Sequence, residues 1–336
     1  MSELNSIVLK ILSGGKGILA ADESTATMTK RLDSVNVPST PENRLSFRQT
    51  LFSSSSMSEC IGGVILYDET IKQKTLNSQN IPDLINSVNS IPGIKVDTGA
   101  KILANSSKEK ITEGLDGLRD RLKEYHKLGA RFTKWRGVYT IAKEYPSKLA
   151  IHSNAHALAR YAALVQESAM VPIVEPEVLM DGNHTAQDCY IKTSEVIKKC
   201  FEELILHKVD LTGVILKPNM ILSGSNSNEK INGNEIAKLT VECLKNSVPS
   251  EVPGIAFLSG GQSEIEATEN LNLINKENKS NFIMSYSYGR ALQQSALKHW
   301  SKNIKDTEGT QAVFNHRVKM NTLAAQGKWS RELENK

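Results

Sequence analysis

The sequence predicts one α/β domain folded as a (β/α)8 barrel, and three features of the chain predict it. Eight short apolar runs, rich in β-branched or aromatic residues, have the length of β-strands. Most gaps between the runs are long enough for a crossover helix, which needs about a dozen residues. Charged residues follow nearly every run, at the strand ends where a barrel carries its site. An open doubly wound sheet is the alternative, and the charged strand ends favour the barrel.

The strands are expected, in chain order, at runs that begin apolar and end polar or charged: GILAADES (17–24), GGVILYDE (62–69), GIKVDTG (93–99), RFTKWRG (131–137), VPIVEPE (171–177), GVILKPN (213–219), GIAFLSGG (254–261) and FIMSYSYGR (282–290). The charged residues at their ends are Asp22, Asp68, Lys95 with Asp97, Lys134 with Arg136, Glu175 with Glu177, Lys217 and Arg290.

Helices are expected in five of the gaps, at residues 112–128, 147–170, 185–207, 234–246 and 264–275. The segment 222–235 is polar and is expected to form a loop. We expect residues 1–336 to form a single domain that ends in a short polar, loop-like tail from about residue 327.

The composition is that of a globular protein and excludes several classes of partner. Of the 336 residues, 39% are hydrophobic and 23% charged, and the net charge is only +4. Aromatic residues make up 5% and no basic run is long, so neither a nucleic acid nor a membrane surface is expected as a partner. No apolar stretch approaches the ~18 residues of a membrane span, and the N-terminus lacks the pattern of a signal peptide. The four cysteines lie far apart, as free thiols do in a reducing compartment, so the expected location is the cytoplasm.

Lys217 is the sharpest candidate for chemistry. It ends the apolar run 213–216 and precedes Pro218, so in a barrel its stem would be partly buried at the mouth. Burial and a neighbouring cation would both lower the pKa of its amine, and a neutral amine attacks a ketone to form a Schiff base. On spacing alone, a lysine in an ordinary ion pair, or one snorkelling at a strand end, is the commoner explanation.

Lys134 and Arg136 lie two apart on a strand, so they point to one side while Thr133 and Trp135 point to the other. Inside a barrel the two cations must meet anions, which are either carboxylates or a substrate phosphate. Glu175 and Glu177 share a face in the same way and, with Asp22, can supply general acid and base groups. A purely structural layer of salt bridges explains the spacing equally well.

Two loops are candidates for phosphate binding. Ser259-Gly260-Gly261 follows the seventh run, and Gly289-Arg290 follows the eighth. Glycines let backbone amides approach an anion, and barrels often hold phosphate in the loops after strands seven and eight. A tight turn is the alternative for a glycine pair.

His152 and His156 lie four apart on an expected helix and are candidate zinc ligands. The chain has no HExxH motif, and no nearby cysteine or aspartate completes a set. We therefore expect ordinary helix residues here and no metal site.

Taken together, residues 10–328 resemble the class I, metal-independent fructose-bisphosphate aldolases. Any one segment is weak, but the combination is specific: GKGILAADES (15–24), GIKVD (93–97), KWR (134–136), VPIVEPE (171–177) with DGNH (181–184), ILKPN (215–219), FLSGGQSE (257–264), and SYGRALQ (287–293) with SALK (295–298).

The resemblance implies roles for individual residues. Lys217 matches the Schiff-base lysine, and Glu175 matches the proton-transferring glutamate, with Glu177 beside it. Lys134 matches the lysine that holds charge near the nucleophile. Asp22 matches the aspartate that orients the carbon-4 hydroxyl. The substrate and phosphate contacts are implied to be Arg31, Ser259, Gly260, Gly261, Ser287, Gly289 and Arg290, with Lys95 and Arg136 as further cationic contacts. A homotetramer that acts on a sugar phosphate in glycolysis and gluconeogenesis, without metal or cofactor, is implied as well.

The chain departs from the better-known members at its end. Those members finish in a mobile tail with a terminal tyrosine that assists proton exchange at the enamine, whereas this chain ends in Glu334-Asn335-Lys336. The departure leaves open the rate of the enamine step and the preference for a bisphosphate over a monophosphate.

Three rival functions remain at this level. A transaldolase or a tagatose-bisphosphate aldolase would use the same fold and chemistry, although two phosphate loops favour a bisphosphate. A non-catalytic scaffold is a different class, and the intact Lys217, Glu175, Lys134 and Asp22 disfavour it. A metal-dependent aldolase would need a ligand set that the sequence does not offer.

Overall fold

The computed structural model describes residues 2–106 and 108–335, and their centre is a closed barrel of parallel strands. The barrel order is β1-β10-β9-β8-β7-β6-β3-β2, so neighbours in the chain are neighbours in the sheet. The eight strands are β1 (Gly17–Ala21), β2 (Ile61–Leu66), β3 (Ile91–Lys95), β6 (Phe132–Tyr139), β7 (Val171–Val178), β8 (Ile215–Leu216), β9 (Gly254–Phe257) and β10 (Ile283–Tyr288). Each coincides with one of the eight apolar runs, which confirms the predicted (β/α)8 barrel.

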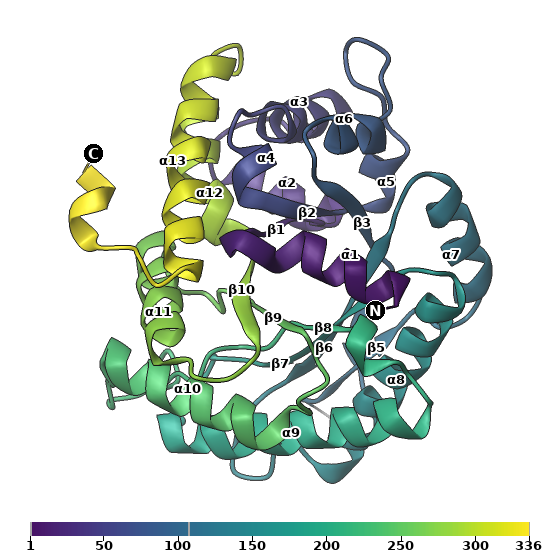
Figure 1. The fold of residues 1–336 in the computed structure, drawn as a ribbon, viewed down its shortest axis with the longest axis vertical. Helices are drawn as coiled ribbons and strands as arrows, with labels where there is room; N and C mark the ends of the chain where they lie inside the picture. The colour runs from purple at the N-terminus through teal and green to yellow at the C-terminus, as the bar shows by residue number, and fades with distance from the viewer. Residues whose placement is uncertain (1, 107, 336) are drawn as a thin grey trace.

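Helices surround the barrel in chain order (Figure 1). They are α2 (Thr25–Asp33), α3 (Pro41–Phe52), α4 (Met57–Cys60), α5 (Asp68–Ile71), α6 (Ile81–Ser87), α7 (Leu118–Lys127), α8 (Lys148–Glu167), α9 (Ala186–Leu206), α10 (Gly233–Ser247), α11 (Glu264–Glu277), α12 (Arg290–Trp300) and α13 (Thr307–Ala325). Four of the five expected helices are found nearly as predicted, at α8, α9, α10 and α11. Within the described residues, no helix is both long and apolar enough to cross a membrane.

The expected helix at residues 112–128 is wrong over its first part. Strand β5 (Lys110–Glu113) occupies that part and pairs in antiparallel fashion with β4 (Gly99–Ile102) outside the barrel. Gly114 and Gly117 then take φ values of 126° and 66°, which a right-handed helix cannot include, so α7 starts only at Leu118.

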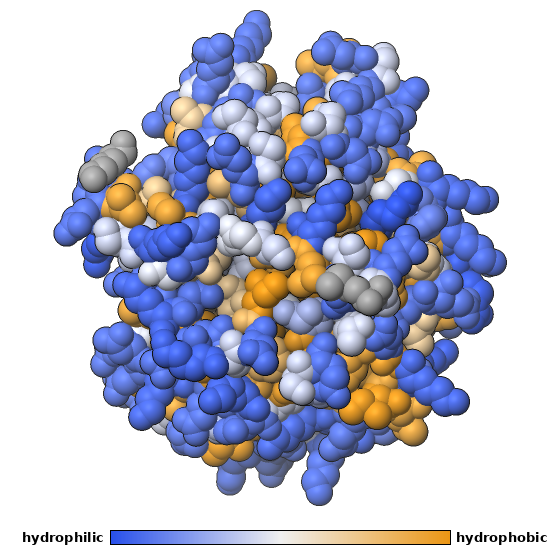
Figure 2. All heavy atoms as spheres, in the orientation of Figure 1, coloured by the Kyte–Doolittle hydropathy of each residue, from blue (hydrophilic) through white to orange (hydrophobic). Residues whose placement is uncertain are grey.

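A helix at the N-terminus, α1 (Glu3–Leu12), closes the amino-terminal end of the barrel. Figure 1 shows it lying across the strands, and Figure 2 shows hydrophobic atoms gathered beside it on an otherwise hydrophilic face. Val8, Ile11 and Leu12 are fully buried and pack against the inward side chains of the strands. Their spacing of three and four residues places them on one face of the helix.

Gly62 lets α1 lie directly against the barrel, and we expect Gly62→Ala to destabilise the protein by about 3 kcal/mol. A Cβ atom at this position would lie 1.9 Å from the carbonyl oxygen of Ile11, so α1 would have to move off the barrel. Gly137→Ala is the matched control, because a Cβ there meets its nearest neighbour only at 3.6 Å. Equilibrium unfolding in urea measures both changes, and equal stabilities for the two variants would contradict this account of α1.

Inside the barrel, side chains change from apolar to ionic along strands β6 and β7. On β7, Ile173 points into the barrel and Val174 into the layer between strands and helices, so Glu175 points inward again. The same alternation on β6 sends Phe132 inward and Trp135 outward, and the hydroxyl of Thr133 bonds outward to Tyr161 of α8 at 2.7 Å. This confirms that Lys134 and Arg136 share the side opposite to Thr133 and Trp135.

The polar tail from residue 327 was expected to be loop-like, but part of it is docked on the barrel. Trp329 is buried, and residues Arg331–Asn335 form a short 3-10 helix. The Glu334 carboxylate accepts two hydrogen bonds from Arg317, at 2.9 and 2.6 Å, and a third from Trp329 Nε1 at 2.7 Å. The buried guanidinium of Arg317 therefore has its anionic partner in the tail.

Deleting residues 330–336 is expected to change turnover less than tenfold but to lower the stability by about 3 kcal/mol. The stability falls because Arg317 keeps its buried charge and loses Glu334, whereas every barrel residue of the predicted site remains. Steady-state kinetics and thermal unfolding of the truncated protein test the two parts separately. A much larger loss of turnover would show that this tail takes part in catalysis.

Candidate active site

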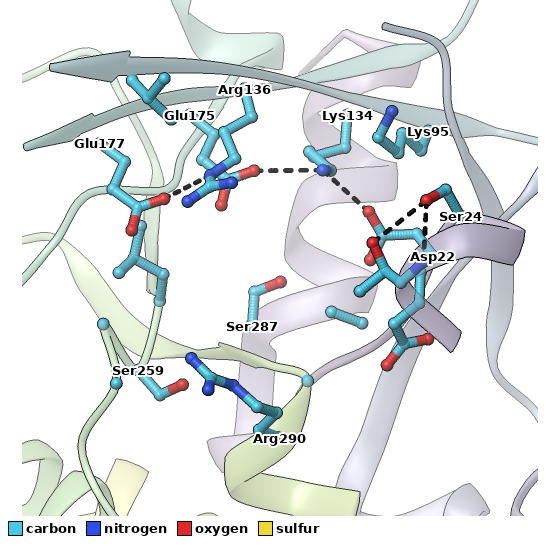
Figure 3. A pocket seen from close by; sticks show the side chains of 18 of the residues that line it. Asp22, Ser24, Lys95, Lys134, Arg136, Glu175, Glu177, Ser259, Ser287 and Arg290 are labelled. Atoms are coloured by element: carbon cyan, nitrogen blue, oxygen red, sulfur yellow. Dashed lines mark hydrogen bonds and ion pairs between the residues drawn. The ribbon is translucent and has the colours of Figure 1, made fainter. Parts of the chain in front are cut away.

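A cavity of about 1050 Å³ opens at the carboxyl ends of the barrel strands. Every residue that the sequence predicted for the site lines it: Asp22, Arg31, Lys95, Lys134, Arg136, Glu175, Glu177, Lys217, Ser259, Gly260, Gly261, Ser287, Gly289 and Arg290. Figure 3 shows the row from Glu177 to Lys95 on one side of the cavity, with Ser259, Ser287 and Arg290 on the other. The cavity thus has acidic and basic side chains along one wall, and serine hydroxyls with Arg290 along the other.

Four charged side chains form a chain of contacts at the base of this cavity. Lys217 Nζ lies 3.1 Å from Glu175 Oε1, and the other oxygen of Glu175 lies 3.4 Å from Lys134 Nζ. Lys134 Nζ also lies 2.8 Å from Asp22 Oδ2 (Figure 3). The side chains of Lys217, Glu175 and Lys134 are each about 5% exposed, at 6%, 4% and 5%. Two lysines and two carboxylates are therefore held in a nearly dry environment, where charges interact strongly.

The backbone explains why Lys217 and Glu175 meet. Strands β7 and β8 pair with Val174 opposite Leu216, so the next residue of each strand points into the barrel beside the other. The amide of Lys217 donates to the carbonyl of Val174 at 2.8 Å, which extends the pairing past the end of β8. Asn219 lies two residues after Lys217, and its side-chain oxygen accepts a hydrogen bond from the amide of Val178 at 3.0 Å. This bond also holds the end of β7 against the segment that follows β8.

The electrostatics keep three of these groups charged. Burial alone would raise the pKa of Asp22, but Lys134 and Lys217 outweigh it and lower that pKa to about 2. Burial opposes the charge on Lys134, and Asp22, Glu175 and Asp97 outweigh that effect, so the pKa of Lys134 is raised. The pKa of Glu175 is lowered against its burial, first by Lys217 and then by Lys134. The site therefore holds ionised carboxylates beside a fixed ammonium at neutral pH.

Two further ion pairs lie along the same wall of the cavity. Arg136 Nε donates to Glu177, one strand away on β7. Lys95 Nζ lies 2.6 Å from Asp97 Oδ1 and also donates to the Asp97 carbonyl at 2.7 Å. The anions that face Lys134 and Arg136 in this structure are thus carboxylates of the protein.

The opposite wall has the features of an anion site. Gly260 and Gly261 have φ values of 56° and 84°, a left-handed backbone that favours glycine and turns the loop toward the cavity. Arg290 begins α12, so its guanidinium and the helix N-terminus face the same space. The hydroxyl of Ser287 is buried and has no hydrogen-bond partner among residues 2–106 and 108–335. A phosphate oxygen would satisfy that hydroxyl.

Arg31, from α2, reaches the cavity from a third direction. Its guanidinium pairs with Glu23 and donates to Gln293 Oε1 at 3.2 Å. Lys30 and Ser34 line the cavity beside it. This cluster lies on α2, whereas Arg290 begins α12, so the cavity offers cations from two separate elements.

Sequence reasoning missed some residues of the cavity, and one of the charged strand ends, Asp68, does not reach the cavity. Asp97, Lys30 and Tyr67 line the cavity but were not predicted as site residues. Asp97 could have been found, because it is two residues from Lys95 near the end of the same strand. Asp68 lies outside the cavity, since α5 begins there and its carboxylate accepts from Tyr125 and pairs with Lys72, both at 2.8 Å.

The chain is similar to known proteins over its whole length. Residues 3–336 match a family model described as fructose-bisphosphate aldolase class-I. The chain is 46% identical to a probable fructose-bisphosphate aldolase class 1 of Xanthomonas campestris pv. campestris, over 98% of this chain and 99% of that protein. It is 49% identical to the cytosolic fructose-bisphosphate aldolase 6 of Arabidopsis thaliana, over 93% of this chain and 87% of that one. Fructose-bisphosphate aldolase of Plasmodium falciparum, solved with TRAP and a small-molecule inhibitor, has 44% identity and a TM-score of 0.96, with 98% and 95% of the two chains covered.

Proposed function

The chain belongs to the class I fructose-bisphosphate aldolase family, and from that premise we propose that Lys217 is its Schiff-base nucleophile. The reaction of the family is the reversible cleavage of fructose 1,6-bisphosphate to dihydroxyacetone phosphate and glyceraldehyde 3-phosphate, through a lysine Schiff base and without a metal. The observation that carries our assignment is the buried contact of 3.1 Å between Lys217 Nζ and Glu175 Oε1. A nucleophile and a proton-transfer group at this separation form the pair that imine chemistry requires.

In the proposed first half of the reaction, Lys217 passes a proton to Glu175 across their 3.1 Å contact, and its neutral amine then adds to the ketone at carbon 2. The resulting carbinolamine loses its hydroxyl as water, and Glu175 delivers the proton that this departure needs. Lys134 stays protonated between Glu175 and Asp22, because both carboxylates favour its charge. It thereby keeps a positive charge near the nucleophile without competing for the ketone.

In the second half, the iminium accepts the electrons of the breaking bond between carbon 3 and carbon 4. Glu175 removes the proton of the carbon-4 hydroxyl, which Asp22 orients, and glyceraldehyde 3-phosphate leaves. The remaining enamine is protonated at carbon 3 and hydrolysed to dihydroxyacetone phosphate, which frees Lys217. Glu175 can serve in both halves because its two oxygens face Lys217 and Lys134 separately.

The two cationic clusters are proposed to anchor the two phosphates. One is formed by Arg290 with Ser287 and the Ser259-Gly260-Gly261 loop, and the other by Arg31 on α2. Lys95 and Arg136 are proposed as further contacts, released in part from Asp97 and Glu177 when substrate arrives. Binding at both ends supplies the energy that positions carbon 2 over Lys217.

Replacing Arg290 with glutamine is expected to raise KM for fructose 1,6-bisphosphate roughly tenfold to a hundredfold, since a charge-assisted hydrogen bond to phosphate is lost. The effect on kcat is expected to be smaller, because Arg290 lies across the cavity from Glu175 and Lys134 (Figure 3). Initial rates over a range of substrate concentrations measure both constants. Arg119→Gln is the matched control, because Arg119 pairs with Glu167 at the surface. An unchanged KM in the Arg290 variant would remove this residue from the phosphate site.

Substrate profiling tests the proposed function as a whole. The protein is expected to cleave fructose 1,6-bisphosphate with a higher kcat/KM than fructose 1-phosphate or tagatose 1,6-bisphosphate, and a chelator is expected to leave the rate unchanged. A preference for tagatose 1,6-bisphosphate, or a rate abolished by the chelator, would contradict the proposal.

We further propose that residues 1–336 work as one domain in a cytoplasmic homotetramer. A similar protein of Arabidopsis thaliana is named cytosolic, which supports the location. Sedimentation velocity tests the assembly, and a species of one chain at micromolar concentration would contradict it.

A further inference from the structure

Four side chains that the aldolase reaction does not use meet on the outside of the barrel. His152 and His156 lie one turn apart on α8, and Glu203 and His207 lie one turn apart at the end of α9. The two helices pack against each other, so the four side chains face one another across their contact. None of the four lines the active-site cavity.

The Glu203 carboxylate is the centre of this cluster. Its Oε1 lies 3.4 Å from His152 Nδ1, and its Oε2 lies 3.4 Å from His156 Nδ1. One potential ligand atom from each of His156, Glu203 and His207 lies within 4.8 Å of the others. In a tetrahedral zinc site, ligand atoms about 2.0–2.1 Å from the metal lie about 3.3 Å apart. The potential ligand atoms of His156, Glu203 and His207 therefore lie within about 1.5 Å of the separations that such a site requires.

The tautomer of His207 suits a metal ligand. Its Nδ1 lies 2.8 Å from the backbone carbonyl oxygen of Glu203, so Nδ1 carries the hydrogen and donates it. In that tautomer Nε2 holds the free lone pair, which is the arrangement that metal-binding histidines use when the other nitrogen is held by a carbonyl. The ring centroids of His156 and His207 are 4.9 Å apart, so the two imidazoles can approach one ion.

Burial and charge also suit a cation at this position. The Glu203 side chain is only 4% exposed, whereas those of His152 and His156 are 59% and 46% exposed. A buried carboxylate therefore lies beside two imidazoles that solvent can reach. Lys199 Nζ lies 3.2 Å from Glu203 Oε1 and equally near Glu202, so it competes with any cation for Glu203.

We propose that His156, Glu203 and His207 bind one divalent transition-metal ion of the zinc type, with His152 or water as the fourth ligand. Imidazole nitrogens and one carboxylate suit zinc rather than magnesium or calcium, which prefer oxygen ligands throughout. The ion would tie α8 to α9 outside the active site, so it stabilises the fold without entering the aldolase reaction. Sequence reasoning considered His152 and His156 as zinc ligands and set them aside, because Glu203 and His207, which complete the cluster, lie far along the chain on α9.

Titration of zinc chloride into the metal-stripped protein, followed by calorimetry, tests this proposal. One zinc ion per chain is expected, and zinc should raise the melting temperature of the native protein while a chelator reverses the increase. The double variant His156→Asn with His207→Asn should bind zinc roughly a hundredfold more weakly. Lys199→Gln should bind it roughly fivefold more tightly, because a competing charge is removed.

Controls separate this site from other histidines, from folding and from the aldolase function. His126→Asn, which changes a histidine on α7, should leave the affinity for zinc unchanged. Cleavage of fructose 1,6-bisphosphate by the double variant should match the native rate, which shows that it folds. Zinc binding that survives in the double variant, or no binding by the native protein at micromolar zinc, would overturn the proposal.

Discussion

Replacing Lys217 with arginine is expected to lower kcat for fructose 1,6-bisphosphate by on the order of 10⁴ to 10⁶-fold. A guanidinium stays protonated at every pH the protein tolerates, so it has no lone pair with which to attack the ketone. The positive charge beside Glu175 is kept, and the buried cluster of Glu175, Lys134 and Asp22 should therefore still form. The variant would therefore lose catalytic activity while keeping its fold.

Steady-state kinetics with coupled detection of dihydroxyacetone phosphate measures this effect, and thermal unfolding checks the fold. Lys72→Arg is the matched control, because Lys72 forms a partly exposed ion pair with Asp68 away from the cavity. That control should retain native kcat. A Lys217→Arg protein that keeps more than about a tenth of native kcat would require another nucleophile.

Replacing Glu175 with glutamine is expected to lower kcat by about 10² to 10⁴-fold, which is the usual contribution of a positioned general acid or base. The amide has nearly the same shape but cannot exchange the protons of carbinolamine dehydration and carbon–carbon cleavage. KM should change much less, because the phosphate-binding wall across the cavity is untouched (Figure 3).

Comparison with Glu177→Gln makes this prediction specific. Glu177 pairs with Arg136, whereas Glu175 lies between Lys217 and Lys134, so loss of the Glu177 charge should lower kcat less. Equal losses in the two variants would mean that charge in the cavity, rather than proton transfer at Glu175, determines the rate.

The barrel and its charged mouth were predictable because they depend on local patterns. The strands are largely buried on both faces and so appear as continuous apolar runs, as in Ile61–Leu66, where every residue is buried. The alternation of side chains along a strand then fixes which residues meet, as for Lys134 and Arg136 against Thr133 and Trp135. The resemblance to the family added the roles, which spacing alone left open.

The features that sequence reasoning missed depend on contacts between distant segments. Strand β5 was mistaken for helix because its partner β4 and the turns at Gly114 and Gly117 decide its conformation. The tail was expected to be loop-like because its polar residues give no sign that Glu334 pairs with the buried Arg317. The contacts of His152 and His156 with Glu203 were not predictable from the sequence, because Glu203 lies on a different helix, α9.

We propose that Lys217 forms the covalent intermediate, and trapping that intermediate is the most direct test. The native protein is incubated with dihydroxyacetone phosphate, reduced with borohydride and digested for peptide mass spectrometry. We expect a reduced adduct on Lys217, which should form equally well in the presence of a chelator. An adduct on another lysine, or none at all, would contradict the proposed mechanism.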